Sequence, residues 1–231
     1  MKYETKKSAE AFLLFILMSL LAGFMIGLGG TSSLLAANLL GAWGKLVGAT
    51  LFSLGIFVII SFEMKLFTGM VAEIPTMGAK NLWRLPVVFL GNAAGVAITA
   101  LLVRFSPLAD IVIPQGAAVI APKLAAESWA IRSFSSAVLC GFLITLSVWG
   151  PRYAPKKGLS ASVAVMLPII VFAFCGFDHS VANMLYFYFL GECSGKILLY
   201  ILCSVLGNVV GGVLIPLVAL LKTKVEAQSS R

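Results

Sequence analysis

The sequence contains few charged residues, and this scarcity excludes an ordinary soluble domain. Only 11% of its 231 residues are Asp, Glu, Lys or Arg, whereas a typical soluble domain carries about 25%. None of these four residue types occurs in 11–44, 46–62, 85–103, 133–151, 158–177 or 197–221. Because about 20 apolar residues cross a bilayer as a helix, these runs predict about six membrane spans. The connections between them are too short for a separate catalytic domain.

Histidine and paired cysteines are also scarce, which argues against an enzyme. The chain has 1 histidine, His179, and its 4 cysteines show no CxxC spacing. A membrane protease or a lipid-modifying transferase would need a nucleophile with its base, or a cluster of metal ligands. We therefore expect a protein that is not an enzyme and that binds neither a metal nor a cofactor.

The charges that are present are mostly basic and lie in the predicted loops. The 17 Lys and Arg against 9 Asp and Glu give a net charge of +8, but a nucleic-acid partner would need a basic face on a soluble body. With the N-terminus in the cytoplasm, the cations predicted on the cytoplasmic side are Lys2, Lys6, Lys7, Lys80, Arg84, Arg152, Lys156, Lys157, Lys222, Lys224 and Arg231. Those predicted at the opposite face are Lys45, Arg104, Lys123, Arg132 and Lys196. This asymmetry predicts a multi-pass protein of the cell membrane with both termini cytoplasmic, and no nucleic-acid partner.

Unusual residues recur at a nearly fixed separation, which predicts two related halves. The pairs Ala22 and Ala137, Phe62 and Phe177, Met70 and Met184, and Gly91 and Gly207 lie 115, 115, 114 and 116 residues apart. The string Gly-Asn-x-x-Gly at 91–95 also recurs at 207–211. Each half, about 8–106 and about 123–222, would hold three spans, so the second half crosses the membrane in the opposite sense. The predicted fold class is an all-α integral membrane protein, one domain over 1–231, with six helices in two inverted three-helix repeats.

Two segments interrupt the predicted second and fifth spans with residues that are costly in a membrane. In the first segment, Glu63 and Lys65 stand at membrane depth, where each costs about 2.5–3.5 kcal/mol unless it faces water, protein or a partner charge. The matching segment of the second half holds His179. Irregular backbone at this depth is tolerated where it is buried in protein or lines a cavity. We predict that both helices are broken here and face a pore, although His179 could instead be a hydrogen-bonded packing residue.

Small residues four positions apart occur on several spans. The pairs are Gly23 with Gly27, Gly91 with Gly95, Ala137 with Gly141, and Gly207 with Gly211. Such pairs let two helices approach closely. The pattern applies equally to helices within one protomer and to helices of neighbouring protomers.

The strings Leu66-Phe67-Thr68-Gly69 and Gly176-Phe177-Asp178-His179-Ser180-Val181-Ala182-Asn183-Met184 resemble those of the formate/nitrite transporter family. This resemblance covers nearly the whole chain. It implies an aquaporin-like protomer with its own pore, assembled in the lipid membrane as a homopentamer. The implied substrates are small monovalent anions such as formate, nitrite or hydrosulfide, with protons as a further partner.

The resemblance also implies roles for residues near the second interruption. His179 would donate or relay a proton to the permeating anion, and Thr68 would hydrogen-bond to it, although Thr68 could equally cap a short helix. For Asn183 and Asp178 we favour a structural role, in which they satisfy backbone groups freed by the break, over direct contact with the substrate.

An apolar constriction is implied on each side of the central site. Leu66 and Phe172 would form it on the outer side with Phe52 beside them, and Phe67 and Ile56 would narrow the inner side. Packing in an ordinary core is the alternative for all five residues.

The sequence departs from the family pattern at its charged positions. The family's central lysine falls at Ala125, so Lys123 could take its place or be an ordinary solvated loop residue, with Arg132 as the next candidate. Lys65 replaces the family's usual acidic residue. It could pair with Glu63 for charge compensation, or supply the positive charge missing at Ala125.

These expectations combine into one mechanism and one alternative. A bare anion would lose its hydration in an apolar constriction at high cost, and a proton exchanged at His179 would remove that cost. The predicted function is therefore a channel or transporter for small weak-acid anions. The alternative is a pore for a small neutral solute such as water or ammonia, although the paired Asn-Pro-Ala motifs usual in aquaporins are missing.

Overall fold

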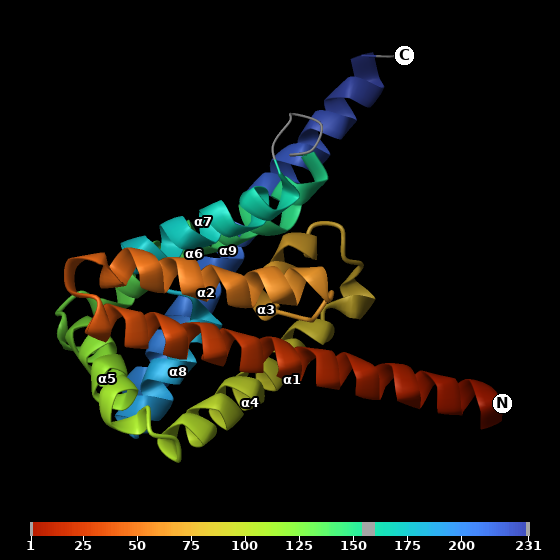
Figure 1. The fold of residues 1–231 in the computed structure, drawn as a ribbon. Coiled ribbons are helices and arrows are strands. Elements are labelled where there is room, and N and C mark those ends of the chain that lie inside the picture. Colours follow the sequence, from red (N-terminus) through yellow and green to blue (C-terminus); the bar gives the residue numbers. More distant parts are fainter. Residues whose placement is uncertain (1, 154–159, 230–231) are drawn as a thin grey trace.

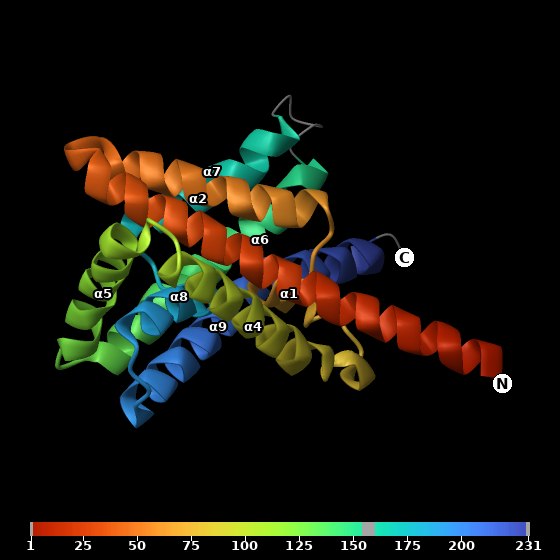
Figure 2. The ribbon, with the colours of Figure 1, turned by 60° about the horizontal axis from the view of Figure 1, so that its bottom comes forward.

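The computed structural model describes residues 2–153 and 160–229, and every regular element in these ranges is helical (Figure 1). Both chain ends lie at one end of the molecule, which we call the terminal face, and helix α5 lies at the opposite end, which we call the α5 face (Figures 1 and 2). Residues 154–159 of the predicted second repeat lie outside the described part of the chain. The same holds for several of the cations counted above, namely Lys156, Lys157, Arg231 and the side chains of Lys2, Lys6, Lys7 and Arg152.

The long helices have the length and hydropathy of membrane spans. The elements in chain order are α1 (Lys2–Leu39), η1 (Gly41–Trp43), α2 (Gly44–Ser61), α3 (Phe67–Met70), η2 (Val71–Glu73), η3 (Ala79–Asn81), α4 (Arg84–Arg104), α5 (Ala109–Ala125), α6 (Trp129–Tyr153), α7 (Ala161–Cys175), α8 (Ser180–Leu190) and α9 (Gly195–Ser229). Within the described ranges, 5 helices, at α1, α2, α4, α6 and α9, are long and apolar enough to cross a membrane. Helices α7 and α8 meet at a bend of 44° and would bring the number to 6 if they form one span.

Small residues bring α1 against α4 and α6 against α9. A Cβ atom at Gly95 of α4 would overlap the Leu20 carbonyl of α1, and one at Gly211 of α9 would overlap the Val138 carbonyl of α6. These glycines let two backbones touch, which replaces the hydrophobic drive that is absent between helices in lipid. The small-residue pairs therefore pack helices within one protomer.

Helices α2 and α7 pack on each other between these two pairs, with α2 also against α1 and α7 against α6. Phe52 of α2 meets Phe172 of α7 edge to face, with ring centroids 5.6 Å apart. Ile56 and Ile169 are buried beside them. The side chains at this contact come from helices far apart in the sequence and surround the middle of the molecule.

The segment that joins the two predicted halves contains a helix, α5, which the sequence analysis did not predict. In α5, Val112, Gly116 and Ile120 are buried at intervals of four residues, which is the spacing of one helix face. This face packs mainly on α8 and α1. Lys123 consequently lies in the last turn of a packed helix and is not a residue of a solvated loop.

Candidate functional site

Two chain breaks meet near the middle of the molecule, at the places where the sequence predicts interruptions. Helix α2 ends at Ser61 and α3 begins at Phe67, while α7 ends at Cys175 and α8 begins at Ser180. The residue before each new helix is extended, with φ −101° and ψ 129° at Leu66, and φ −101° and ψ 114° at His179. Leu66 and His179 therefore hold equivalent positions at the two breaks.

An asparagine from the repeated Gly-Asn-x-x-Gly string fixes the first break. The Asn92 side-chain nitrogen Nδ2 donates to the Ser19 carbonyl at 2.7 Å and to the Lys65 carbonyl at 2.9 Å. Its Oδ1 accepts from the Phe67 amide at 2.8 Å. One buried amide group thus ties α1, the break and the start of α3 to α4, and it satisfies backbone groups that the break leaves without helical partners.

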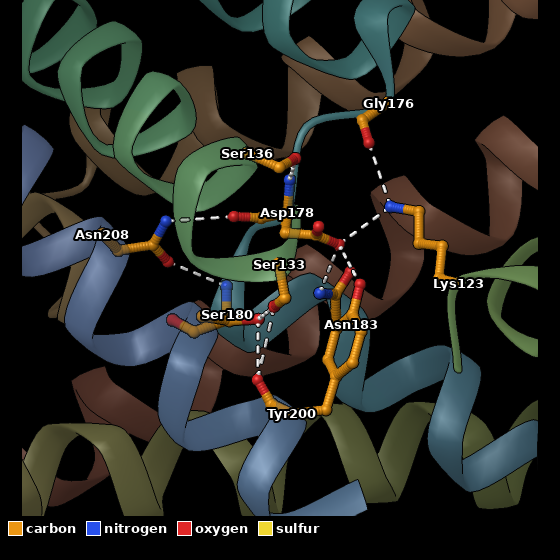
Figure 3. Close-up of polar contacts among 10 residues, drawn as sticks. Lys123, Ser133, Ser136, Gly176, Asp178, Ser180, Asn183, Tyr200 and Asn208 are labelled. Atoms are coloured by element: carbon orange, nitrogen blue, oxygen red, sulfur yellow. Dashed lines mark hydrogen bonds and ion pairs between the residues drawn. The ribbon is translucent and has the colours of Figure 1, made fainter. Parts of the chain in front are cut away.

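The second asparagine makes the equivalent three bonds at the second break, and Figure 3 shows those to Asp178 and Ser180. Asn208 Nδ2 donates to the Ala137 carbonyl at 2.9 Å and to the Asp178 carbonyl at 3.0 Å. Its Oδ1 accepts from the Ser180 amide at 2.9 Å. The sequence repeat locates both asparagines, but it assigns them no role, because the carbonyls they bind are not marked by any residue type.

His179 and Thr68 lie together at the centre, as expected. The His179 Nε2 atom is 3.0 Å from the Thr68 Oγ1 atom, and the two side chains are 1% and 0% exposed. His179 Nδ1 accepts from the Ala182 amide at 3.1 Å, so the proton of a neutral ring sits on Nε2, where it can be donated to Thr68. His179 therefore caps α8 with Nδ1, while Nε2 faces Thr68 at the centre of the molecule.

Aromatic rings cover the histidine on one side. The Phe172 ring stacks on the His179 ring, with centroids 5.7 Å apart and planes 27° apart. Phe52 stands edge-on to Phe172, and Phe67 lies separately against Phe89 of α4, with centroids 5.1 Å apart. The His179 ring is therefore shielded by apolar side chains, while Phe67 packs toward α4.

Cavities lie on both sides of this centre. Phe52, Phe172, His179, Asn183 and Lys123 line a cavity of about 170 Å³ toward the α5 face. A second cavity, of about 450 Å³ toward the terminal face, is lined by Ile56, Leu66 and Glu63, among others. Leu66 thus lines this second cavity together with Ile56, whereas Phe52 and Phe172 line the first.

Asp178 gathers three donors on one carboxylate oxygen beside the histidine (Figure 3). Its Oδ1 accepts from Lys123 Nζ at 2.8 Å, from Asn183 Nδ2 at 2.9 Å and from Tyr200 Oη at 2.9 Å. Lys123 also donates to the Gly176 carbonyl at 3.0 Å. The carboxylate is nearly fully buried, and the partner ammonium pairs its charge.

Tyr200 is a site residue that the sequence analysis missed. It is 1% exposed, and its ring packs against Trp129 and Phe187. Tyr200 lies eight residues before Asn208 on α9, a spacing of about two turns that places both on one helix face. That spacing is the signal that could have found it.

The charged residues of the first break, Glu63 and Lys65, are arranged differently from the Lys123–Asp178 ion pair of the second break. Among the described residues, no ion pair joins Glu63 and Lys65 within 4.0 Å, so the local salt bridge, one of the two alternatives for this pair, is not formed. The backbone of Glu63 is in the left-handed region, with φ 53°, which turns the chain sharply between the two residues. Arg132, the second candidate for the central cation, is exposed on α6.

A family model described as formate/nitrite transporter matches residues 1–222. The chain belongs to this family. Formate/nitrite transporters are multi-pass proteins that carry out transport across a membrane, and the apolar helices of this member agree with that. The resemblance carried by the two strings is confirmed.

Individual relatives and solved structures agree with the family. The chain is 31% identical over 156 residues to the formate channel FocA of Haemophilus influenzae, a match that covers 62% of this chain and 53% of that channel. It is 29% identical over 192 residues to the nitrite transporter NirC of Salmonella typhimurium, covering 78% and 69%. A solved FNT family ion channel, 27% identical, superimposes with a TM-score of 0.75 over 90% of this chain and 89% of that one. A pentameric formate channel with formate bound, 20% identical, has the same fold, with a TM-score of 0.73 over 94% and 98%.

Proposed function

We propose that this formate/nitrite transporter is a channel for small monovalent weak-acid anions such as formate, nitrite or hydrosulfide. The observation that carries the proposal is the buried His179–Thr68 hydrogen bond, 3.0 Å long, between cavities that open toward opposite faces. The names of the relatives, formate channels and nitrite transporters, support the same substrate class.

The proposed architecture is six spans in two inverted three-helix repeats, α1–α4 and α6–α9, with α2–α3 and α7–α8 as the broken second and fifth spans. The matched hydrogen bonds of Asn92 and Asn208 support this, because equivalent atoms serve equivalent purposes in both halves. We place both termini in the cytoplasm on the excess of cations there. Five protomers, each with its own pore, form the proposed assembly, as in the pentameric formate channel of the same fold.

The pore between the cavities is apolar. Phe52 and Phe172 line the cavity toward the α5 face, and Ile56 and Leu66 line the cavity toward the terminal face. Phe67 packs against Phe89 of α4. A bare anion passing these side chains would lose its water with no polar replacement, which costs several kcal/mol at least. A neutral acid avoids that cost, so a proton must join the anion at the centre.

His179 supplies that proton through Nε2 in the proposed mechanism. The neutral ring offers Nε2–H as a hydrogen-bond donor to an arriving anion, in place of the Thr68 hydroxyl. A full transfer from Nε2 to the anion is balanced by a proton that Nδ1 takes up from a hydronium ion of the solvent, because a neutral ring that only gave a proton up would become an anion. To accept that proton, Nδ1 gives up its hydrogen bond from the Ala182 amide, and after the transfer the ring is neutral again, with its proton on Nδ1.

Fluxes into liposomes test the proposal. We would measure formate, nitrite, hydrosulfide, acetate and lactate uptake by purified protein at several pH values, with water and ammonia as neutral solutes. The wild-type protein should pass a subset of the acids. His179→Gln, which keeps a donor near Nε2 but cannot titrate, should bind the anion and lose the pH dependence of its flux, while His179→Ala should lose both.

Two outcomes would contradict the proposal. If His179→Ala took up every acid as the wild type does, proton exchange at His179 would be disproved. If the wild-type protein passed only the neutral solutes, a pore for water or ammonia would be favoured instead.

A further inference from the structure

The charges that line the cavities on the two sides of the centre are unequal. The residues lining the cavity toward the α5 face include Lys45 and Lys123 but no Asp or Glu. Those lining the larger cavity toward the terminal face include Lys65 with Glu63 and Glu73. An anion therefore meets only cations on one side, and one cation between two carboxylates on the other.

The charge of Lys123 is not free to attract an anion. Its ammonium lies 2.8 Å from the Asp178 carboxylate and donates also to the Gly176 carbonyl. This ion pair is neutral as a unit, and at 3–4 Å a paired carboxylate cancels most of the potential that the ammonium would produce a few ångströms away.

The second lysine that lines this cavity is Lys45. It lies in the first turn of α2, and its Nζ stands 5.3 Å from the centroid of the Phe174 ring of α7. Among the described residues, no carboxylate lies within 4.0 Å of it. A cation at the first turn of a helix is also unfavourable, because the amino end of a helix is already positive. Its position therefore does not serve the stability of α2.

We propose that Lys45 is the residue that captures the anion at the α5 face, and that Lys123 acts with Asp178 as a positioning pair for the second break. The inference rests on the proposed function and adds a specificity-determining residue to it. The positive potential of Lys45 and of the amino end of α2 raises the local concentration of anions at the cavity. This potential lowers the half-saturation concentration for anions supplied at the α5 face. It does not change the direction of net flux, which the electrochemical gradient of the anion determines.

A matched pair of substitutions tests this role. Lys45→Gln removes the charge inside the cavity. Lys196→Gln removes a charge from the start of α9, where Lys196 stands 5.8 Å from the Trp129 ring centroid and does not line the cavity. Formate influx would be measured against formate concentration at low and high ionic strength, in liposomes whose protein orientation is determined by protease access to the C-terminal segment.

We expect Lys45→Gln to raise the half-saturation concentration for formate supplied at the α5 face by about threefold to tenfold at low salt, with the maximal rate unchanged. The difference should shrink as salt screens the wild-type charge. Lys45→Arg should keep the wild-type value, and Lys196→Gln should shift it by less than about twofold.

The outcomes separate this inference from the proposed function. No acid flux through the wild-type protein would overturn the function and the inference with it. Flux in the wild type with equal half-saturation in Lys45→Gln, or equal shifts in Lys45→Gln and Lys196→Gln, would overturn the inference alone. Lys45→Met serves as a second neutral variant. If neither neutral variant yields folded protein, Lys45 is a structural residue and the capture role is wrong.

Discussion

The two chain breaks share a scaffold but differ in chemistry. At both, an asparagine on the neighbouring long helix makes the same three backbone bonds, and the residue before the new helix is extended. The first break then carries Glu63 and Lys65 with no ion pair between them, whereas the second carries Asp178 with three donors on one oxygen. Holding an interrupted backbone in place thus requires one amide, and the titratable groups beside it are free to differ.

Replacing one of the two asparagines should cause the largest loss of stability. Asn208→Leu keeps the approximate size but leaves the Ser180 amide and the Asp178 carbonyl unpaired, each at about 1–3 kcal/mol, and removes the tie to the Ala137 carbonyl of α6. We expect loss of most of the folded protein, seen by size-exclusion chromatography and thermal unfolding in detergent.

Asn92→Leu should cause the same loss of folded protein as Asn208→Leu, because it removes the equivalent three hydrogen bonds at the first break. Asn81→Ala, at an exposed position, serves as the control. Normal folding of Asn92→Leu beside a misfolded Asn208→Leu would mean that the two asparagines are not equivalent.

Removing the carboxylate of the second break should have the next largest effect. Asp178→Asn leaves the Lys123 ammonium without its partner, and because Lys123 is 28% exposed the cost is discounted from the fully buried case to about 2 kcal/mol. Denaturation of the purified variant should reveal this loss, together with at least a tenfold lower anion flux.

The matched change at the first break is Glu63→Gln. Since Glu63 is exposed and forms no ion pair with any described residue, the stability of the variant should stay within about 0.5 kcal/mol of the wild type. A large loss in Glu63→Gln would show that the two breaks depend on charge to the same degree.

A smaller effect is expected at Tyr200, which supplies one of the three donors to Asp178. Tyr200→Phe keeps the ring packing and removes one hydrogen bond to a charged group that keeps two other donors, for a loss of about 1.5 kcal/mol in unfolding free energy. Tyr188→Phe is the control, because its hydroxyl bond to the Ala93 carbonyl is 3.3 Å long and the residue is more exposed. Equal losses in the two variants would remove Tyr200 from the site.

The smallest effect is expected at Ser180, whose position at the second break corresponds to Phe67 at the first. Its hydroxyl is fully buried, and among the buried side-chain N and O atoms of the described ranges it is the one without a hydrogen-bond partner. Ser180→Ala should therefore leave unfolding unchanged or stabilise the protein by up to about 1 kcal/mol, measured by thermal unfolding. A clear loss of anion flux in a stable Ser180→Ala protein would mean that the hydroxyl binds the permeating species.

The sequence predicted the positions of the breaks because they carry charges and the histidine inside apolar runs. It also marked Asn92 and Asn208 through the repeated string. The pairing of Thr68 with His179 came from the family resemblance alone, since nothing local to either residue specifies the other.

Other features depend on tertiary packing and left little local trace. Helix α5 was not predicted, because its charge-free stretch between Asp110 and Lys123 is too short to mark a membrane span, although Val112 and Ile120 lie on its buried face. The donors to Asp178 come from α5, α8 and α9, so their meeting point is fixed by how these helices pack.

Helix α5 also has a consequence for how the protein can have arisen. In the proposed two-repeat architecture, α1–α4 correspond to α6–α9, whereas α5 joins the halves and has no counterpart. Its last turn carries Lys123 to Asp178. Two separate, identical half-chains could build both asparagine scaffolds, but they could not supply this lysine to one break only. The ion pair beside the histidine is thus a property of the joined chain, and the connection between the halves is part of the proposed transport site.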